Sequence, residues 1–550
     1  MIRGHAVRAS RDRAFAFAIA TLLALLLVPG VADAAVGDLT FVRCASNDGS
    51  GGACANLSGS SFDEPGAVTV SPGGDPIAAV RTSYNVTRFN SGLGFLSCVS
   101  NVATAGLCTD LVAPALYSPP GDVVVTPDGG TLYVSGPAND AVTRYALQPT
   151  GGLAYLGCVS NDGSGGACTN VPGSAFDAPA AMAISPDGDS LYVASRVSSS
   201  VTHFTIGAGG ALSFEACASD SGSGGDCSNV PGTVFATPAV LAVSPDGGAL
   251  YASASLSDTL TRFSLAPAGQ MAYTGCVSNA ATGTCTDLPG SPMLEPQGVA
   301  VAPGGAAVHV VATSSDSLVD LSVSPTGDLA FAGCSSQSGS AGTCADLPDA
   351  FDAPNAVAIS PDGRSIYANA SVSDSVSRFD AGAGGTATFA GCISDTGTGG
   401  ICADLPGAAF DRPADLAMNA AGSALYVSAA DSDSVTQFAR EMPDTTPPGL
   451  TLKVKKKGKL GKPIAVTATC DETCSLSLSG TLKLKGGAVG RLPDRSAALA
   501  AGAPATVKLK PKGRLKRKLR RVGKARARIT IVATDAAGNV TDAFAKQRLK

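Results

Sequence analysis

The sequence predicts an all-β protein: a seven-bladed β-propeller closed by an N-terminal strand, followed by a small C-terminal β-sandwich. Three observations support this prediction. The 550 residues include 66 Gly and 34 Pro but no Trp, and 15% are charged, against a typical 25%. Cysteines recur about every 59 residues. Short apolar stretches alternate with turn residues, which excludes a coiled coil or a disordered polyelectrolyte.

One repeat, residues 179–217, shows four expected strands separated by Gly-, Pro-, Asp- or Ser-rich turns. Four antiparallel strands in a repeated unit are typical of a propeller blade. The expected strands are Ala181–Ile184, Ser190–Ala194, Val201–Ile206 and Ala211–Ala216. By the same pattern, blades start near Gly66, Gly121, Ala181, Val240, Gly298, Ala356 and Asp415.

The seventh blade lacks its fourth strand, because the repeat stops after Val435–Phe438. A matching segment lies at the other end of the chain, where Gly37–Cys44 has the pattern of Gly152–Cys158. We therefore expect the N-terminal strand to complete the last blade, which removes the exposed edges of an open array.

Residues 1–34 have the features of a signal peptide, with four arginines before an apolar stretch and Ala32-Asp33-Ala34 as a cleavage site. The alternative is a retained membrane anchor, but the apolar stretch is short and is broken by Pro29. No later segment has the length of a transmembrane span. We expect an extracytoplasmic protein, secreted or at the cell surface, with the propeller in residues 35–440.

The cysteine pattern predicts disulfides, because 16 cysteines fall in close pairs in an exported chain. A metal site would need shorter spacings and accompanying histidines, which the pairs lack. The predicted pairs are Cys44 with Cys54, Cys98 with Cys108, Cys158 with Cys168, Cys217 with Cys227, Cys276 with Cys285, Cys334 with Cys344, Cys392 with Cys402, and the local pair Cys470 with Cys474.

Residues 126–134, 185–193 and 360–379 carry Pro-Asp-Gly turns followed by Leu-Tyr-Val or Ile-Tyr-Ala strands. This repeat resembles that of the seven-bladed lactonase-like and YVTN surface-layer propellers, over about residues 37–440. The resemblance implies the propeller fold. It also implies either a lactonase or cycloisomerase activity or a surface-binding role, since family members differ in this respect.

The last part of the chain differs in charge from the rest. Residues 35–440 carry a net charge of −25 and contain no Lys, whereas residues 441–550 carry +18. Residues 441–449 are a Pro-rich linker, and residues 450–550 alternate apolar and polar positions, as in a β-sandwich. Residues 533–540 resemble bacterial immunoglobulin-like modules.

Two basic segments of this tail, Lys453–Lys462 and Lys508–Lys524, predict adhesion to an anionic cell-envelope polymer. The alternatives are a solvated face or docking onto the acidic propeller. Aromatic residues do not interleave with these lysines, so we expect no sequence-specific nucleic-acid binding.

Histidine-based catalysis has little support, because the exported chain keeps only His203 and His309. His203 aligns with arginines of other repeats and is expected to be structural. Aspartates are the better candidates for binding a ligand or a cation. One set precedes the first strands of blades: Asp63, Asp177, Asp352 and Asp411. A second set lies between second and third strands: Asp140, Asp258, Asp316, Asp374 and Asp433.

These acids are predicted to form rings at the channel mouth, where they could hold a divalent cation; the alternative is that each caps a turn. No other cofactor is expected. Overall, the sequence favours an exported binding or surface-interaction protein with an adhesive basic tail. A lactonase-like hydrolase using the channel-mouth carboxylates is the alternative, and a structural surface-layer component is a third hypothesis.

Overall fold

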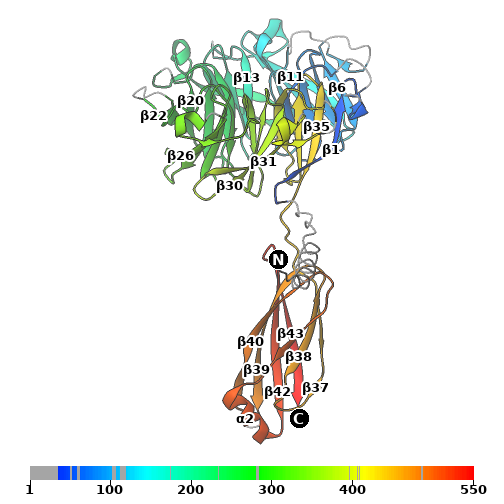
Figure 1. Ribbon diagram of the computed structural model, residues 1–550. Helices are drawn as coiled ribbons and strands as arrows, with labels where there is room; N and C mark the ends of the chain where they lie inside the picture. Colours follow the sequence, from blue (N-terminus) through cyan, green and yellow to red (C-terminus); the bar gives the residue numbers. More distant parts are fainter. Residues whose placement is uncertain are drawn as a thin grey trace, which may run out of the picture. The chain divides into compact units, whose positions relative to one another are not determined.

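We analysed a computed structural model of the chain (Figure 1). It describes residues 35–49, 52–57, 62–101, 107–111, 119–173, 175–232, 234–279, 284–337, 339–395, 397–405, 407, 409–484 and 487–550. The predicted signal peptide, residues 1–34, lies outside the described residues. The chain divides into two compact units, Met1–Glu441 and Met442–Lys550. Among the described residues, no helix is long and apolar enough to cross a membrane.

The first unit contains seven five-stranded sheets, which we number I to VII by their first strands (Figure 1). In order, these strands are β3 (Pro65–Val70), β8 (Val123–Val125), β13 (Pro179–Ile184), β18 (Pro238–Val243), β23 (Pro296–Val301), β28 (Pro354–Ile359) and β33 (Pro413–Met418). Each first strand packs against the first strand of the next sheet, and β33 packs against β3. The seven sheets therefore close on themselves.

The second and third strands of each sheet are almost entirely buried, which their Val, Ile, Leu, Tyr and Ala content explains. The second strands are β4 (Pro76–Val80), β9 (Thr131–Gly136), β14 (Ser190–Ser195), β19 (Ala249–Ala254), β24 (Ala307–Ala312), β29 (Ser365–Ala370) and β34 (Ala424–Ala429). The third are β5 (Asn85–Phe89), β10 (Ala141–Leu147), β15 (Ser200–Ile206), β20 (Thr259–Leu265), β25 (Ser317–Val323), β30 (Ser375–Ala381) and β35 (Ser434–Arg440).

The fourth strand of each sheet is mostly half-buried or exposed in its first part, and its last two or three residues are buried. In sheets I to VI these strands are β6 (Phe95–Ser100), β11 (Leu153–Ser160), β16 (Leu212–Ser219), β21 (Met271–Ser278), β26 (Leu329–Ser336) and β31 (Ala387–Ser394). In sheet VII the fourth strand is the N-terminal β1 (Leu39–Ser46), which pairs antiparallel with β35 from Leu39 opposite Arg440 to Ser46 opposite Ser434.

A fifth strand of two residues lies parallel to the end of each fourth strand. These strands are β7 (Thr109–Asp110), β12 (Thr169–Asn170), β17 (Ser228–Asn229), β22 (Thr286–Asp287), β27 (Ala345–Asp346), β32 (Ala403–Asp404) and β2 (Ala55–Asn56). A disulfide links each fourth strand to the residue immediately before the fifth, as in Cys217–Cys227. The intervening loops contain short 3₁₀ turns at Gly163–Gly166, Gly222–Gly225, Gly339–Gly342 and Gly397–Gly400.

The fold prediction is corrected by these sheets. The sequence predicts a propeller built of four-stranded blades, whereas the structure consists of stacked five-stranded sheets, each with a disulfide. Two-residue strands cannot show the alternation by which sequence analysis finds strands, so the fifth strand escapes it. The all-β class is confirmed.

Tyrosines of the second strands connect neighbouring sheets. The hydroxyl of Tyr192 in sheet III donates a hydrogen bond to the Gly269 carbonyl of sheet IV at 2.9 Å. Tyr133 makes the equivalent bond to Gly210 at 2.7 Å, and Tyr426 to Ser91 at 2.9 Å. The backbone hydrogen bonds of each sheet end at its edges, so contacts between sheets must come from side chains. The recurring tyrosine of the sequence provides one such contact.

The second unit has one apolar core between two sheets. The smaller sheet contains β36 (Leu450–Val454), β38 (Ile464–Cys470) and β41 (Ala505–Leu509). The larger contains β37 (Lys457–Gly458), β43 (Val540–Leu549), β42 (Ala525–Asp535), β39 (Cys474–Leu484) and β40 (Val489–Leu499), in that order. The prediction of a β-sandwich built of strands alone is wrong here, because the unit also contains the helix α2 (Gly513–Val522). Leu519 of this helix is buried in the core.

All 16 cysteines are paired as the spacing predicts, and none is free. Eight disulfides indicate an oxidising environment. The bonds are Cys44–Cys54, Cys98–Cys108, Cys158–Cys168, Cys217–Cys227, Cys276–Cys285, Cys334–Cys344, Cys392–Cys402 and Cys470–Cys474.

We predict that the double substitution Cys217→Ser and Cys227→Ser lowers the free energy of unfolding by about 2–3 kcal/mol. The bond closes a loop of 10 residues in the unfolded chain, and losing it restores that loop's entropy. Thermal and urea unfolding measure the change. The control is Cys470→Ser with Cys474→Ser, whose separation of 4 residues predicts a smaller loss, confined to the second unit. An equal loss in both variants would contradict the loop-entropy account.

Candidate functional site

The nine aspartates predicted as ligands lie where neighbouring sheets meet. Those of the second set follow second strands and have left-handed backbones, with φ between 46° and 51°, a conformation that Asp tolerates better than most residues. Each accepts a hydrogen bond at 2.7–2.8 Å from a backbone N–H of the next sheet. The pairs, given as acceptor and donor, are Asp140 and Ala178, Asp258 and Glu295, Asp316 and Ala353, Asp374 and Arg412, and Asp433 and Glu64.

The two sets of aspartates meet in pairs at four of these junctions. Asp177 lies beside Asp140, and burial and this neighbouring charge raise the pKa of Asp177. The same causes raise the pKa of Asp352 beside Asp316. Asp374 with Asp411, and Asp433 with Asp63, form the other two pairs. The structure thus brings the two predicted sets together across sheet boundaries.

Two junctions lack this bond, and their sequences differ accordingly. Sheet I has Tyr84 in place of the aspartate, opposite Pro119, which has no N–H to donate. Sheet III has Ser199, and no side chain accepts from Thr237 among the described residues. Each aspartate of the second set therefore has an N–H donor in the next sheet, whereas the Thr237 N–H has no such acceptor among the described residues. None of the nine lines the central cavity, and their role as cation ligands stays a prediction.

Both histidines are buried at repeated positions. His203 stacks on Tyr192 with ring centroids 5.0 Å apart, and its Nε2 lies 3.0 Å from Ser190 Oγ. His309 replaces the recurring tyrosine, and its Nδ1 lies 2.8 Å from the Asp320 carboxylate. Asp320 also accepts from the Ala387 N–H of the next sheet at 2.7 Å. These contacts give both residues structural roles.

The disulfide cysteines lie apart from the central cavity and take no part in a candidate site. The second cysteine of each bond in the first unit directly precedes a two-residue fifth strand, so it fastens the outer edge of its sheet. Bonded sulfurs of this kind offer no thiolate for catalysis or metal binding. The residues to which this structural role applies are Cys54, Cys108, Cys168, Cys227, Cys285, Cys344 and Cys402.

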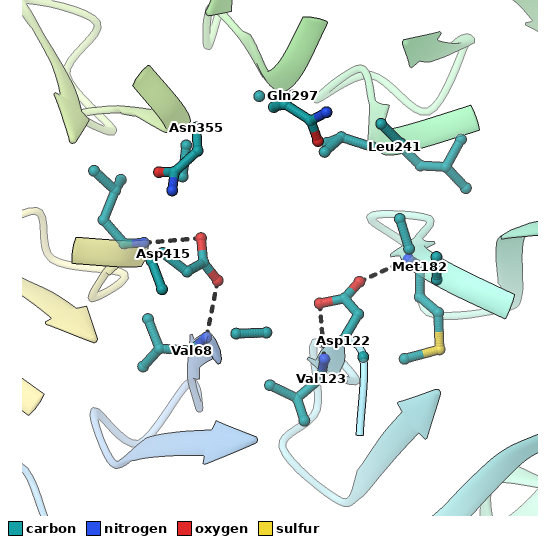
Figure 2. Close-up of a pocket in the computed structure, with 18 of the residues that line it drawn as sticks. Val68, Asp122, Val123, Met182, Leu241, Gln297, Asn355 and Asp415 are labelled. Carbon is teal, nitrogen blue, oxygen red and sulfur yellow. Dashed lines mark hydrogen bonds between the residues drawn. The ribbon is translucent and has the colours of Figure 1, made fainter. Parts of the chain in front are cut away.

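A central cavity of about 560 Å³ lies among the first strands of the seven sheets (Figure 2). Small and apolar side chains form most of its wall, such as Ala181, Leu241 and Val299. Six polar or charged residues break the repeat there, and sequence analysis does not select them as site residues. They are Arg81, Asp122, Arg196, Gln297, Asn355 and Asp415.

The two acids of the cavity occupy the same position of their strands. Asp122 Oδ1 accepts from its neighbour Val123 N–H at 2.7 Å, and Oδ2 accepts from Met182 N–H of sheet III at 2.7 Å. Asp415 accepts in the same way from its neighbour Leu416 N–H and from Val68 N–H of sheet I, each at 2.8 Å (Figure 2). Both carboxylates are held toward the cavity by backbone donors alone.

The cavity raises the pKa of both acids. Burial, and next the charge of Asp415, raise the pKa of Asp122 to about 7. Burial raises the pKa of Asp415 to about 6, against the opposing effect of Arg81. Removal from water disfavours a charged carboxylate, and a nearby like charge adds to that cost.

Arg81 and Arg196 follow the second strands of sheets I and III, at a position that is Ser255, Thr313 or Ser371 elsewhere. Gly66 leaves room for the first guanidinium, since a Cβ there would lie 2.6 Å from Arg81 Nε. Burial, and next the charge of Arg81, lower the pKa of Arg196. The two guanidinium groups therefore interact in the same cavity.

The signal for this site is present in the repeat alignment. Positions equivalent to Asp122 and Asp415 are Ala67, Ala181, Val240, Gly298 and Ala356. A carboxylate at a repeat position that is otherwise small or apolar is not explained by the repeated structure of the sheets. The acids predicted from the sequence are the repeated ones, and their hydrogen bonds between sheets give them structural roles.

The second unit presents a basic face on its larger sheet. Lys457, Arg548, Arg526 and Lys483 lie directly opposite one another on four successive strands, and all four are exposed. A neighbouring row contains Lys546, Arg528 and Arg491. Arg528 also lies 5.1 Å from the ring centroid of Phe544, which is 57% exposed. We call these seven cations the basic face.

A depression of about 470 Å³ adjoins the basic face, and its charged lining is entirely cationic: Lys483, Lys524, Arg526, Arg548 and Lys550. Elsewhere in this unit, the carboxylate oxygens of Asp444, Glu472 and Asp535 lie within 4.8 Å of one another. That acidic cluster has no further feature that points to a metal.

Comparison with known proteins gives no family: neither a protein-family model nor a curated protein matches this sequence. Solved structures similar to the chain include the periplasmic gluconolactonase of Pseudomonas aeruginosa, at 18% identity and TM-score 0.43, covering 79% of this chain and 98% of that one. Virginiamycin B lyase of Staphylococcus aureus is 11% identical, with TM-score 0.45 and coverages of 73% and 99%. A functionally unknown protein from Desulfotomaculum acetoxidans is 14% identical, with TM-score 0.46 and coverages of 66% and 92%.

These similarities are too low to transfer an activity. The resemblance to the lactonase-like and YVTN propeller family is corrected accordingly, since no family model matches, and the neighbours support at most a distant likeness. The immunoglobulin-like resemblance of the tail has no support from these comparisons.

We predict that Asp316→Ala lowers the free energy of unfolding by about 1–2 kcal/mol, because it leaves the half-buried Ala353 N–H without its acceptor. Ser199→Ala is the matched control at a junction without the bond, and its effect should stay within about 0.5 kcal/mol. Urea unfolding measures both. Equal effects would contradict the role given to the aspartates.

We predict that stability falls between about pH 4 and pH 7, partly through Asp122. A carboxyl whose pKa is raised on folding binds its proton more tightly in the folded state, so stability is full below the unfolded pKa and is lost as pH rises toward 7. Allowing for solvent in the cavity, Asp122 contributes on the order of 2 kcal/mol. Asp122→Asn should flatten the profile by that amount, measured as unfolding free energy against pH. An unchanged slope would contradict the raised pKa.

Proposed function

We propose that this protein is an exported binding protein that adheres to an anionic polymer of the cell envelope through its basic face. The observation that carries the proposal is the row of four cations on adjacent strands, Lys457, Arg548, Arg526 and Lys483. Like charges directly opposite one another destabilise a sheet. A polyanion lying across the strands would remove that repulsion.

The cations of the face are not neutralised by the unit itself. Among the described residues of this unit, the one ion pair joins Arg491 to Asp494 at 3.2 Å, and it lies at the margin of the face. The unit has six acids, Asp444, Asp471, Glu472, Asp494, Asp535 and Asp542. Three of them are grouped in the acidic cluster described above. The positive charge of the basic face is therefore not paired with these acids, apart from Arg491, and is free to act at a distance.

The shape of the surface fits a chain of repeating anionic groups. Two rows of cations run across successive strands, and neighbouring strands lie about 4.8 Å apart. Arginine suits carboxylate and phosphate groups because its planar fork donates two parallel hydrogen bonds. The depression lined by Lys524 and Lys550 extends the same positive surface.

The hydrolase alternative has less support. Its proposed carboxylates, such as Asp177 and Asp352, lie at sheet junctions rather than in the central cavity. The acids inside the cavity are Asp122 and Asp415, and both already accept two backbone hydrogen bonds.

We predict that Arg526→Glu with Arg548→Glu weakens binding of the full exported chain to sodium polyphosphate by at least about tenfold at low salt. The matched control is Lys453→Glu with Lys508→Glu, which makes the same change in net charge on the smaller sheet. The control should bind within about threefold of wild type. Fluorescence anisotropy with labelled polyphosphate measures the affinities.

Polygalacturonate, a carboxylate polymer, serves as the second probe and separates phosphate selectivity from general charge attraction. Binding of either polymer should weaken steeply as salt rises. If both double variants lose affinity equally, net charge rather than the basic face would be responsible. If wild type binds neither polymer at low salt, the proposal is wrong.

A further inference from the structure

We propose that the central cavity of the first unit binds a small zwitterion, a molecule that carries both an ammonium and a carboxylate group, such as an amino acid or a short peptide. This inference is independent of the basic face. It rests on four charged side chains and two amides that interrupt the repeat inside a cavity of about 560 Å³, a size suited to small ligands.

The four charges alternate in sign around half of the cavity. Asp415 belongs to sheet VII, Arg81 to sheet I, Asp122 to sheet II and Arg196 to sheet III, and these sheets are neighbours in that order. Sheets IV to VII contribute no further arginine to the lining. An alternating arc of this kind is complementary to a ligand with both charges rather than to a simple anion or cation.

Neither arginine of the cavity has an ion-pair partner among the described residues, although the charge of Arg81 acts on Glu64 and Asp415. No ion pair and no side-chain hydrogen bond involves the guanidinium of Arg81 or Arg196 in the described part of the chain. By contrast, Arg88, Arg378 and Arg440 each pair with an aspartate. Two unpaired guanidinium groups in one cavity form a binding site for a carboxylate.

The two carboxylates form no ion pair with an arginine in the described part of the chain, although the charge of Arg81 acts on Asp415. The hydrogen bonds that Asp122 and Asp415 accept there come from backbone N–H groups, and each acid retains charge that burial makes costly. The ammonium group of a ligand would stabilise their charged forms. The cavity therefore holds two carboxylates and two guanidinium groups that are not joined in ion pairs.

Sheets V and VI contribute amides rather than charges to the cavity wall, and Asn355 lies next to Asp415 (Figure 2). Asn355 donates through Nδ2 to the Pro413 carbonyl at 3.2 Å, while its buried Oδ1 has no partner. Gln297 lies beside it on the neighbouring sheet. Amide groups recognise the peptide or carboxamide part of a ligand, since each supplies both donors and an acceptor.

Exposed apolar residues follow the ends of three second strands. Val197, directly after Arg196, is 68% exposed, and Leu256 and Val372 at the same position of sheets IV and VI are 76% and 63% exposed. Apolar side chains at the rim would contact an apolar group of the ligand. We therefore take alanyl-leucine as the probe.

The test is isothermal titration of the full exported chain with three compounds of similar size: alanyl-leucine, N-acetyl-alanyl-leucine and alanyl-leucinamide. We expect alanyl-leucine to bind with a Kd below about 1 mM. Removing the ammonium or the carboxylate charge should weaken binding at least about tenfold each, because either change leaves protein charges unpaired. Equal binding of the N-acetyl compound, or no binding of the dipeptide at about 10 mM, would overturn the proposal.

Variants assign each charge to its partner. Arg81→Gln with Arg196→Gln should bind alanyl-leucine and alanyl-leucinamide equally, since both groups that distinguish them are lost. Asp122→Asn with Asp415→Asn should in the same way stop distinguishing the N-acetyl compound. Arg412→Gln, an exposed arginine outside the cavity, is the matched control and should keep both preferences. Thermal unfolding shows which variants are folded, and preferences that survive in folded cavity variants would contradict the assignment.

Discussion

The first unit depends on hydrogen bonds that pass from one sheet to the next, because the ladder bonds of a β-sheet end at its edges. Carboxylates at one end of the strands accept five of these bonds, as Asp316 does from the Ala353 N–H. Tyrosines toward the other end supply a second set, as from Tyr192 to Gly269. The same geometry recurs at most junctions, so the repeated polar residues of the sequence are explained by structure.

Function is expected where this repetition fails. The central cavity contains acids, arginines and amides at positions that are small or apolar in other repeats, and these groups have not neutralised one another. The second unit differs in kind, since its charge is on one open sheet face and its core is ordinary and apolar. A small ligand in the first unit and a polymer on the second would use separate surfaces, each with its own chemistry.

Much of the architecture could be predicted from the sequence, because the repeat period, the Pro-Asp-Gly turns and the cysteine spacing are all local signals. The role of Gly37–Cys44 as a strand of the last sheet could be read from its likeness to residues 152–158, and β1 occupies that place. The two-residue fifth strands could not, since pairing of Ala218 with Ser228 leaves no periodic pattern. The helix at residues 513–522 could not be predicted either, because it contains only three apolar residues among many Lys and Arg and so has a weak helical pattern.

The site was harder to predict, for a physical reason. A single carboxylate such as Asp122 can be identified as a site residue only when its repeat position is known to face a cavity. Aspartates that recur in most repeats are easier to select from the sequence. The structure shows the opposite of this selection. The recurring aspartates accept hydrogen bonds from backbone N–H groups, and the two acids at an otherwise small or apolar position face the cavity. Arg81 and Arg196 follow the same rule, since other repeats have Ser, Thr, Ala or Pro at their position.

Native-state hydrogen exchange tests most directly whether the aspartates join the sheets. The amides of Ala178 and Ala353 donate to aspartates of the preceding sheet, whereas sheet III has Ser199 at the aspartate position and no side chain of the described residues accepts from the Thr237 amide of sheet IV. The account predicts that the first two exchange at least about tenfold more slowly than Thr237, after correction for intrinsic rates. Equal exchange at all three amides would show that these carboxylates do not hold neighbouring sheets together, and would contradict the account.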